Sequence, residues 1–360
     1  MSACPSHSPR PTVVPGEQEQ TMRSTLTPRG RLALHAALCL LFGACVGSLA
    51  APGAHAADKF AAEFLKIGVG ARALGMGGAF VSIADDATAA YWNPSGLTQL
   101  ESREAFGMHA SQFGGVENHD VLGFSTPIGA RNSRSAIGVT LIRLAIDDIR
   151  ITKDAKVGED QNGNPILDPS LIRTSSASDL ALLLSYATGL GERWSGGVNL
   201  KLVRQSLVDA GASFGIGADV GLRYQASGSL ALGARLADIT TTQLFWDSGR
   251  RETVSPTATL GGSTTRDIGA LKGSLTLALD VALAFEGQEA DQFQSGNLSG
   301  NWHPGLEYWF QKTVALRFGS DGGDFTAGAG LRYKQFGADY AYLAHDVLDA
   351  THRVSAQLRF

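Results

Sequence analysis

Regular alternation of apolar and polar residues is the dominant pattern in most of this chain. In residues 274–285, SLTLALDVALAF, leucine or valine takes every second position, while small or polar residues, including Asp280, take the others. The same pattern recurs in residues 216–225 and 313–320, where charged residues and glycine share one face. A period of two predicts β-strands with one apolar and one polar face.

Counting these segments predicts about fourteen strands. They begin near Arg103, Asp120, Arg134, Ala177, Trp194, Ser213, Ser229, Ser255, Gly273, Asn301, Thr313, Phe325, Phe336 and His352. The longest connections follow odd-numbered strands, whereas most even-to-odd connections are tight turns. A soluble sandwich also alternates, but an even strand number with short turns on one side is typical of an outer-membrane barrel. We therefore predict an all-β transmembrane barrel of about 14 antiparallel strands in the outer membrane of a Gram-negative-type bacterium, with both termini in the periplasm.

The last eight residues, RVSAQLRF, alternate and end on an aromatic residue. Val354, Leu358 and Phe360 fall on one face of this final strand. A terminal aromatic residue on an alternating strand resembles the signal by which outer-membrane barrels are recognised for insertion. The predicted partners are therefore outer-membrane lipid and the barrel-assembly machinery.

Residues 1–56 have the features of a leader that ends in an export signal. A basic region after Met22 precedes the apolar stretch 32–49, which is followed by the cleavage pattern AHA at residues 54–56. We expect translation to start at Met22 and the mature chain to start at Ala57. A retained membrane anchor or lipidation at Cys45 would be the alternatives.

The composition excludes several classes of function. Only 18% of the residues are charged, the net charge is -4, and 44 residues are glycine. Frequent glycine disfavours a helix-rich enzyme, and the weak negative charge gives no reason to expect nucleic acid as a partner. All three cysteines lie in the leader, so the mature chain has no disulfide, thiolate metal site or cysteine nucleophile.

Residues 70–97, GARALGMGGAFVSIADDATAAYWNPSGL, form the most distinctive stretch. Residues 68–73 match a dinucleotide fingerprint, but Asn93 and Pro94 end any following helix and no βαβ unit surrounds it. Asp85 and Asp86 could form an acid/base pair, but adjacent extended residues point to opposite sides and no other catalytic group accompanies them. We predict no catalytic residue, no enzyme activity and no cofactor.

The sequence contains two further groups of polar residues. The oxygen-rich loop 154–170 could hold calcium, but Pro165 stands where an EF-hand needs glycine, and no metal site is predicted. Charged residues at inward positions of the predicted strands are expected to face the lumen and to pair there or contact a plug. They are Lys201, Asp219, Arg223, Asp280, Arg317, Arg332 and Asp339.

The stretch 70–97 and the carboxyl-terminal strand together resemble the PorV/PorQ family, which belongs with the FadL-like outer-membrane barrels. The resemblance implies that residues 57–101 fold inward as a plug and that residues 102–360 form the barrel. The residues that match the family's plug motif are Gly75, Gly77, Gly78, Asp85, Asp86, Asn93, Pro94, Ser95 and Gly96.

Two functions are implied by this resemblance. PorV-type relatives act in type IX secretion, as a shuttle or dock for secreted cargo proteins. FadL-type relatives let hydrophobic small molecules, such as fatty acids and aromatic hydrocarbons, pass by diffusion. The first is our main hypothesis and the second the alternative.

Overall fold

The computed structural model describes residues 62–129, 134–208, 211–285, 292–345 and 350–360. The predicted leader and the first five residues of the predicted plug lie outside these ranges.

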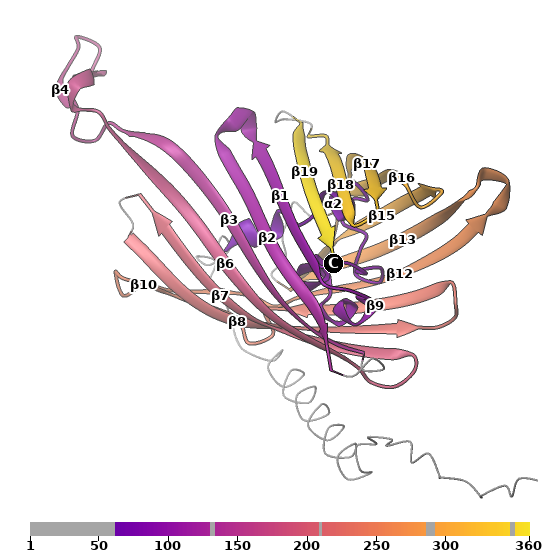
Figure 1. The fold of residues 1–360 in the computed structure, drawn as a ribbon. Coiled ribbons are helices and arrows are strands. Elements are labelled where there is room, and N and C mark those ends of the chain that lie inside the picture. The colour runs from indigo at the N-terminus through magenta and orange to yellow at the C-terminus, as the bar shows by residue number, and fades with distance from the viewer. Residues whose placement is uncertain (1–61, 130–133, 209–210, 286–291, 346–349) are drawn as a thin grey trace, which may run out of the picture. The chain divides into compact units, whose positions relative to one another are not determined.

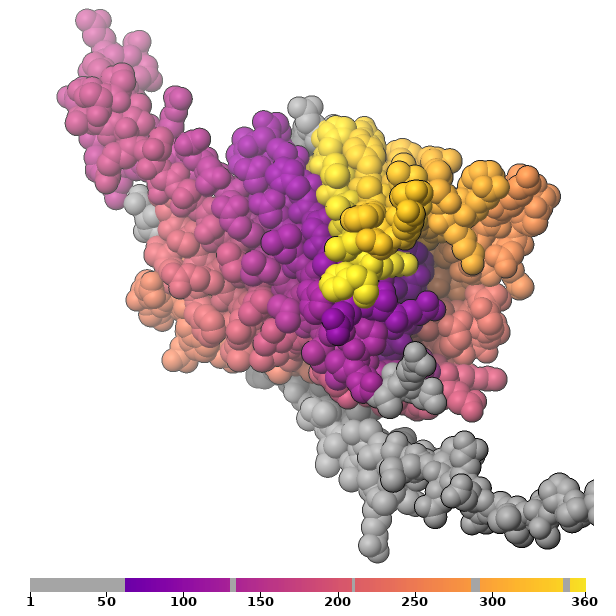
Figure 2. All heavy atoms as spheres, in the orientation of Figure 1, coloured from indigo at the N-terminus to yellow at the C-terminus, as the bar shows by residue number. Residues whose placement is uncertain are grey.

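Fourteen antiparallel strands form a closed barrel in the described part of the chain (Figure 1). They are β1 (Glu104–Gln112), β2 (Glu117–Ile128), β3 (Ser135–Ile151), β6 (Arg173–Gly189), β7 (Trp194–Leu207), β8 (Gly211–Gln225), β9 (Leu230–Ala237), β12 (Thr257–Ile268), β13 (Gly273–Ala284), β15 (Leu298–Phe310), β16 (Val314–Asp321), β17 (Asp324–Tyr333), β18 (Phe336–Leu343) and β19 (Thr351–Arg359). The first and last strands close the wall, in a register from Glu104 opposite Arg359 to Ser111 opposite His352. In Figure 2 the yellow carboxyl-terminal strands lie directly against the purple first strands.

The predicted fold class is confirmed. Each predicted strand start lies within a few residues of the observed one. The alternation also has the predicted direction, because Leu277 and Leu279 are each 46% exposed whereas Asp280, next to Leu279, faces inward at 0%. An outward apolar face and an inward polar face suit a barrel whose outer surface meets lipid. This fold places the chain in an outer membrane.

Short strands inside the long connections were not predicted from the sequence. They are β4 (Lys156–Glu159), β5 (Pro165–Leu167), β10 (Thr242–Trp246), β11 (Arg251–Val254) and β14 (Phe293–Ser295). The β4 and β5 strands form a separate hairpin, which projects well beyond the rest of the wall in Figure 1. Strands of three to five residues are too short for alternation to be recognised. Single 3-10 turns are η3 (Phe113–Gly115), η4 (Pro169–Leu171) and η5 (Gly269–Leu271).

Residues 62–101, which we call the amino-terminal segment, contain only short helical turns. They are η1 (Glu63–Lys66), α2 (Ala71–Leu74), α3 (Ala89–Trp92) and η2 (Pro94–Gln99). No helix in the described residues has the length and hydropathy needed to span a membrane. Asn93 and Pro94 interrupt the helical turns as the sequence predicts, because proline cannot donate the hydrogen bond that a continuing helix needs.

The amino-terminal segment is surrounded by the barrel wall. Nearly all of its residues from Gly68 to Leu100 are buried. Its first turn joins an apolar cluster that contains Phe64, Val121 and Ile142, nearer the long connections. Its last turn, η2, packs against β6, β7 and β8 near the tight turns. The segment therefore runs along the lumen before it enters β1.

Candidate functional site: the contact between the amino-terminal segment and the barrel wall

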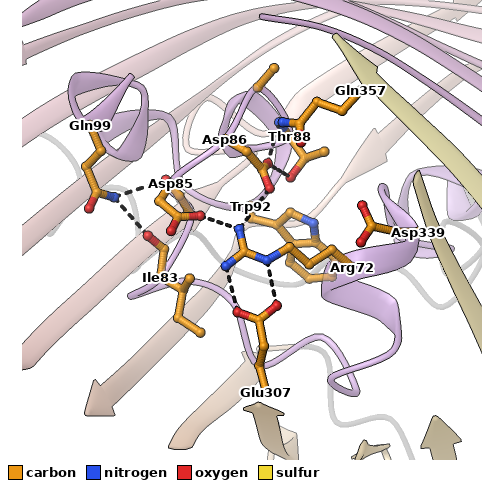
Figure 3. A network of polar contacts seen from close by, with 12 residues as sticks. Arg72, Ile83, Asp85, Asp86, Thr88, Trp92, Gln99, Glu307, Asp339 and Gln357 are labelled. Carbon is orange, nitrogen blue, oxygen red and sulfur yellow. Dashed lines mark hydrogen bonds and ion pairs between the residues drawn. The ribbon is translucent and has the colours of Figure 1, made fainter. Parts of the chain in front are cut away.

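Arg72 joins the amino-terminal segment to the wall through three carboxylates. Its guanidinium donates from Nε and Nη2 to the two oxygens of Glu307 on β15, each at 2.8 Å. Its Nη1 also donates to Asp85 at 2.5 Å and to Asp86 at 3.1 Å, as Figure 3 shows. A two-point contact between guanidinium and carboxylate fixes orientation as well as charge. Arg72 is therefore the main polar attachment of α2.

The electrostatic environment keeps Arg72 charged. Burial disfavours its charged form, but the carboxylates of Asp85, Glu307 and Asp86 outweigh this effect, so the pKa of Arg72 is raised above its usual range. Arg72 also lies over the ring of Phe80, with 5.2 Å between the guanidinium carbon and the ring centroid. Such a stacked cation is further stabilised by the ring.

The ion pairs continue from Glu307 along the wall. Arg317 on β16 donates from Nε to Glu307 at 2.7 Å, and its Nη1 lies 2.9 Å from an oxygen of Asp339 on β18. The other oxygen of Asp339 accepts from Arg332 on β17 at 2.9 Å. Since Arg317 and Glu307 are 0% and 1% exposed, this chain of alternating charges is almost fully buried. Breaking one buried pair leaves an uncompensated charge and costs several kcal/mol, ~3–5 kcal/mol in well-studied cases.

A second group of charges lies on β7 and β8, which three strands separate from β15. Lys201 Nζ on β7 lies 2.9 Å from Asp219 on β8 and 2.7 Å from Asp238. Asn199 donates from Nδ2 to Asp219 at 3.1 Å and to the carbonyl of Ala90 in α3 at 2.7 Å. This amide connects the second group to the amino-terminal segment.

Asp280 on β13 holds the middle of the segment by its backbone. One carboxylate oxygen accepts the N–H groups of Phe80 and Val81, both at 2.7 Å. Asp280 is 0% exposed, and these two N–H groups would otherwise be unpaired in the interior. The contact therefore satisfies backbone groups that no strand or helix uses.

The Asn-Pro-Ser-Gly turn connects parts of the amino-terminal segment with each other and with the wall. Asn93 accepts from the N–H of Ser95 at 3.2 Å and donates to two carbonyls, of Val81 in the segment at 2.7 Å and of Leu222 on β8 at 3.0 Å. A methyl group on Gly96 would lie 2.0 Å from the carbonyl oxygen of Ala84. These contacts explain why this turn needs asparagine and glycine.

Replacement of Asn93 by alanine should loosen the segment while the barrel still assembles. The variant loses both carbonyl contacts and leaves the Val81 oxygen unpaired in the interior, at a cost of about 1–3 kcal/mol. Limited proteolysis at residues 62–101 should become faster, and the gel shift of the folded barrel in unheated detergent should stay the same. Unchanged proteolysis would mean that the turn does not hold the segment.

Inward-facing glycines let the amino-terminal segment approach the backbone of the wall closely. We call them the glycine belt: Gly197, Gly221, Gly233, Gly305, Gly319 and Gly328, on β7, β8, β9, β15, β16 and β17. A methyl group on Gly197 would lie 2.3 Å from the backbone of Pro94, and one on Gly319 would lie 2.3 Å from the backbone of Met76. Gly197 pairs with Gly221, and Gly305 pairs with Gly319, so the belt continues across neighbouring strands. The wall therefore has glycine where the amino-terminal segment comes closest to it.

The predicted residues fall on both sides of this contact. All nine residues of the predicted motif lie in the amino-terminal segment. Within it, Gly77 has a positive φ of 66° and a methyl group there would meet the Ser320 backbone. The seven predicted lumen charges lie on the inward faces of six strands, because Asp219 and Arg223 share β8. Arg223, for example, donates to the carbonyl of Ser82 at 2.9 Å.

Sequence reasoning missed three central residues and was wrong about one detail. Arg72, Glu307 and Asp238 were not singled out. The expectation that Asp85 and Asp86 point to opposite sides is wrong, because both contact the same nitrogen of Arg72. Neither residue lies in a strand, and the backbone bends at Asp86. An arginine within an apolar, glycine-rich stretch was the available signal for Arg72.

The oxygen-rich loop uses its acids internally. Asp160 accepts from the N–H groups of Asn162 and Asn164 and from the Asn164 side chain, at 2.8, 2.8 and 2.9 Å. The bonds from Asn164 and Asn162 lower the pKa of Asp160. In the described residues no three His, Cys, Asp or Glu side chains gather in a metal-binding arrangement.

Solved structures with a similar fold include two toluene transporters and a FadL homologue. The chain matches the toluene transporter TbuX of Ralstonia pickettii at a TM-score of 0.54 and 15% identity, covering 81% of this chain and 98% of that one. It matches the toluene transporter TodX of Pseudomonas putida at 0.52 and 14%, covering 81% and 96%. A FadL homologue of Pseudomonas aeruginosa gives 0.50 and 11%, covering 81% and 98%. At these identities the likeness shows the fold.

Family membership comes from the sequence. No curated protein matches the chain closely enough to count as a relative. The family described as type IX secretion system protein PorV matches residues 55–259, which is more than half of the chain and includes the whole amino-terminal segment. The chain belongs to the PorV family.

Proposed function

We propose that the protein is a non-enzymatic outer-membrane component of a type IX secretion pathway. In this role it docks or escorts secreted cargo proteins, and residues 57–101 serve as a fixed plug. The choice of the type IX secretion pathway rests on membership of the PorV family. The geometry of the site supports a docking role over an open conduit.

The observation that carries this proposal is the attachment of the amino-terminal segment. It is bound to the wall by the ion pairs of Arg72, the backbone contacts of Asp280 and the glycine belt. These contacts involve β7, β8, β9, β13, β15, β16 and β17. A segment held in this way obstructs free diffusion along the lumen, and its displacement would break several buried contacts together.

Affinity capture from native outer membranes tests the docking role. A tagged chain solubilised in mild detergent should co-purify with secreted proteins, and a lipid extract should contain no enriched apolar ligand. Capture of an apolar small molecule without any protein partner would contradict the proposal.

The alternative is passive transport of hydrophobic small molecules. One observation favours it: the apolar cluster inside the barrel, where Phe64 joins Val121, Ile142, Leu183 and Leu244. An apolar lumen of this kind could receive a fatty acid or an aromatic hydrocarbon. Uptake of labelled toluene or dodecanoate into liposomes that contain the protein would favour this role.

We also propose that both termini face the periplasm and that the final strand is the insertion signal. Val354 and Phe360 are 56% and 57% exposed on the outer face, and Leu358 is partly exposed. Deletion of Phe360 should reduce the fraction of protein that reaches the outer membrane several-fold, because the barrel-assembly machinery loses its recognition residue. Replacement of the similarly exposed Phe336, at 57%, is the control. Equal loss in both variants would contradict a specific signal.

A further inference from the structure

Four polar residues on adjoining strands of the barrel interior have buried atoms without hydrogen-bond partners. They are Gln112 on β1, His119 on β2, and Thr351 and Arg353 on β19, and we call them the donor cluster. Arg353 and His119 both lie opposite Ala110 on β1, on either side of it. Gln112 follows Ala110 by two residues, and Thr351 precedes Arg353 by two. The register therefore brings the four onto one inner patch of the wall.

Each of these side chains is more than nine-tenths buried. His119 is 0% exposed and neither ring nitrogen has a partner, and Arg353 is 3% exposed with its Nε unpartnered. Thr351 is 1% exposed and its Oγ1 has no partner, and Gln112 is 5% exposed and its Nε2 has no partner. Buried polar atoms are nearly always hydrogen-bonded, so four unpaired residues on one patch require an explanation.

Arg353 lacks the carboxylate partners that three other buried cations of the lumen have. Arg72, Arg317 and Lys201 each have carboxylate partners within 3 Å. Among the described residues no carboxylate lies within ion-pair distance of Arg353. Asp321, a nearby acid, forms its ion pair with His303 at 3.2 Å. Burial of an unpaired guanidinium is costly unless something compensates its charge.

The chemistry of the donor cluster selects an anion. Arginine, the glutamine amide, the threonine hydroxyl and a ring N–H of histidine can all donate hydrogen bonds. Ala110 and Ala341, both buried, are opposite Arg353 on the two neighbouring strands, and neither alanine side chain can accept a hydrogen bond from the guanidinium. Glu117, opposite Gln112 on β2, forms no ion pair with Arg353.

We propose that the donor cluster binds an anionic group, a carboxylate or a phosphate, inside the barrel. The group forms charge-assisted hydrogen bonds with Arg353 and accepts further bonds from Gln112, His119 and Thr351. It comes either from a free anion or from the head group of a lipid. This site does not depend on the role of the protein in secretion.

Thermal unfolding of the purified mature protein in neutral detergent tests the proposal. Sodium phosphate, compared with sodium chloride at equal ionic strength, probes a free anion. Dodecanoate, compared with dodecanol, probes a lipid head group. At least one anion should raise the melting temperature of the native protein. Stabilisation by phosphate identifies a free anion, and stabilisation by dodecanoate alone identifies a lipid source.

Arg353→Met is the decisive variant and Arg266→Met, at an exposed arginine on β12, is its control. Arg353→Met should abolish the stabilisation by anions and, without anions, should melt no lower than the native protein, because an unpaired buried charge has been removed. Arg353→Lys, which keeps the charge, should bind about tenfold more weakly. The proposal is overturned if no anion stabilises the native protein, if Arg353→Met still responds to anions, or if Arg353→Met fails to fold while Arg353→Lys binds normally.

Discussion

Replacing Arg72 by methionine should release the amino-terminal segment from the wall without preventing barrel assembly. Methionine fills similar space, but the change leaves Glu307 with Arg317 alone and Asp86 without an ion partner in the interior. Removing one partner of a buried pair costs ~3–5 kcal/mol. Hydrogen exchange of amides in residues 70–100 should therefore accelerate by on the order of a hundredfold or more, while amides of the barrel strands keep their rates.

The matched control for this variant is Arg150→Met, at an exposed arginine on β3. It removes one positive charge and no buried contact, so its exchange should equal that of the native protein. If Arg72→Met leaves exchange in the segment unchanged, the ion pairs are incidental to its attachment.

Adding one methyl group to the glycine belt should also weaken the attachment of the amino-terminal segment to the wall. In Gly197→Ala the new carbon would lie 2.3 Å from the backbone of Pro94, a distance that real atoms do not adopt. Either the segment or the strand must move, and overpacking of this type costs ~1–3 kcal/mol. We expect a lower melting temperature together with faster proteolysis of residues 62–101.

Gly269→Ala is the control, because a methyl group there would meet no atom within 4 Å. Neither glycine has a positive φ, so the two variants differ in crowding and not in backbone strain. Equal stability of Gly197→Ala and Gly269→Ala would show that the wall does not require glycine at the contact.

The barrel could be predicted from the sequence because every strand repeats the same signal. One-residue alternation in strands such as β13 and β19 reports which face meets lipid, and the predicted and observed faces agree. The lengths of the connections then indicated which strands are followed by long loops and which by tight turns. The hairpin of β4 and β5 and the short strands β10 and β11 carry no such signal, because they contain only three to five residues.

The contact inside the barrel could be predicted only in part. The alternation along each strand predicts that charges such as Arg317 and Asp339 point inward. Which of them pair with one another depends on the three-dimensional register of separate strands. Glu307 and Arg72 are 235 residues apart in the sequence, and no local pattern relates them. The sequence shows only that glycine is frequent. The role of Gly197 or Gly319 depends on which part of the amino-terminal segment lies opposite it in the folded barrel.

The fixed attachment of residues 62–101 within the barrel is the central claim, and electrical conductance tests it most directly. Purified native protein in a planar lipid bilayer should give no steady ionic current, whereas Arg72→Met should give discrete conductance steps in the same bilayer. A steady open-channel current from the native protein, equal to that of Arg72→Met, would contradict the claim.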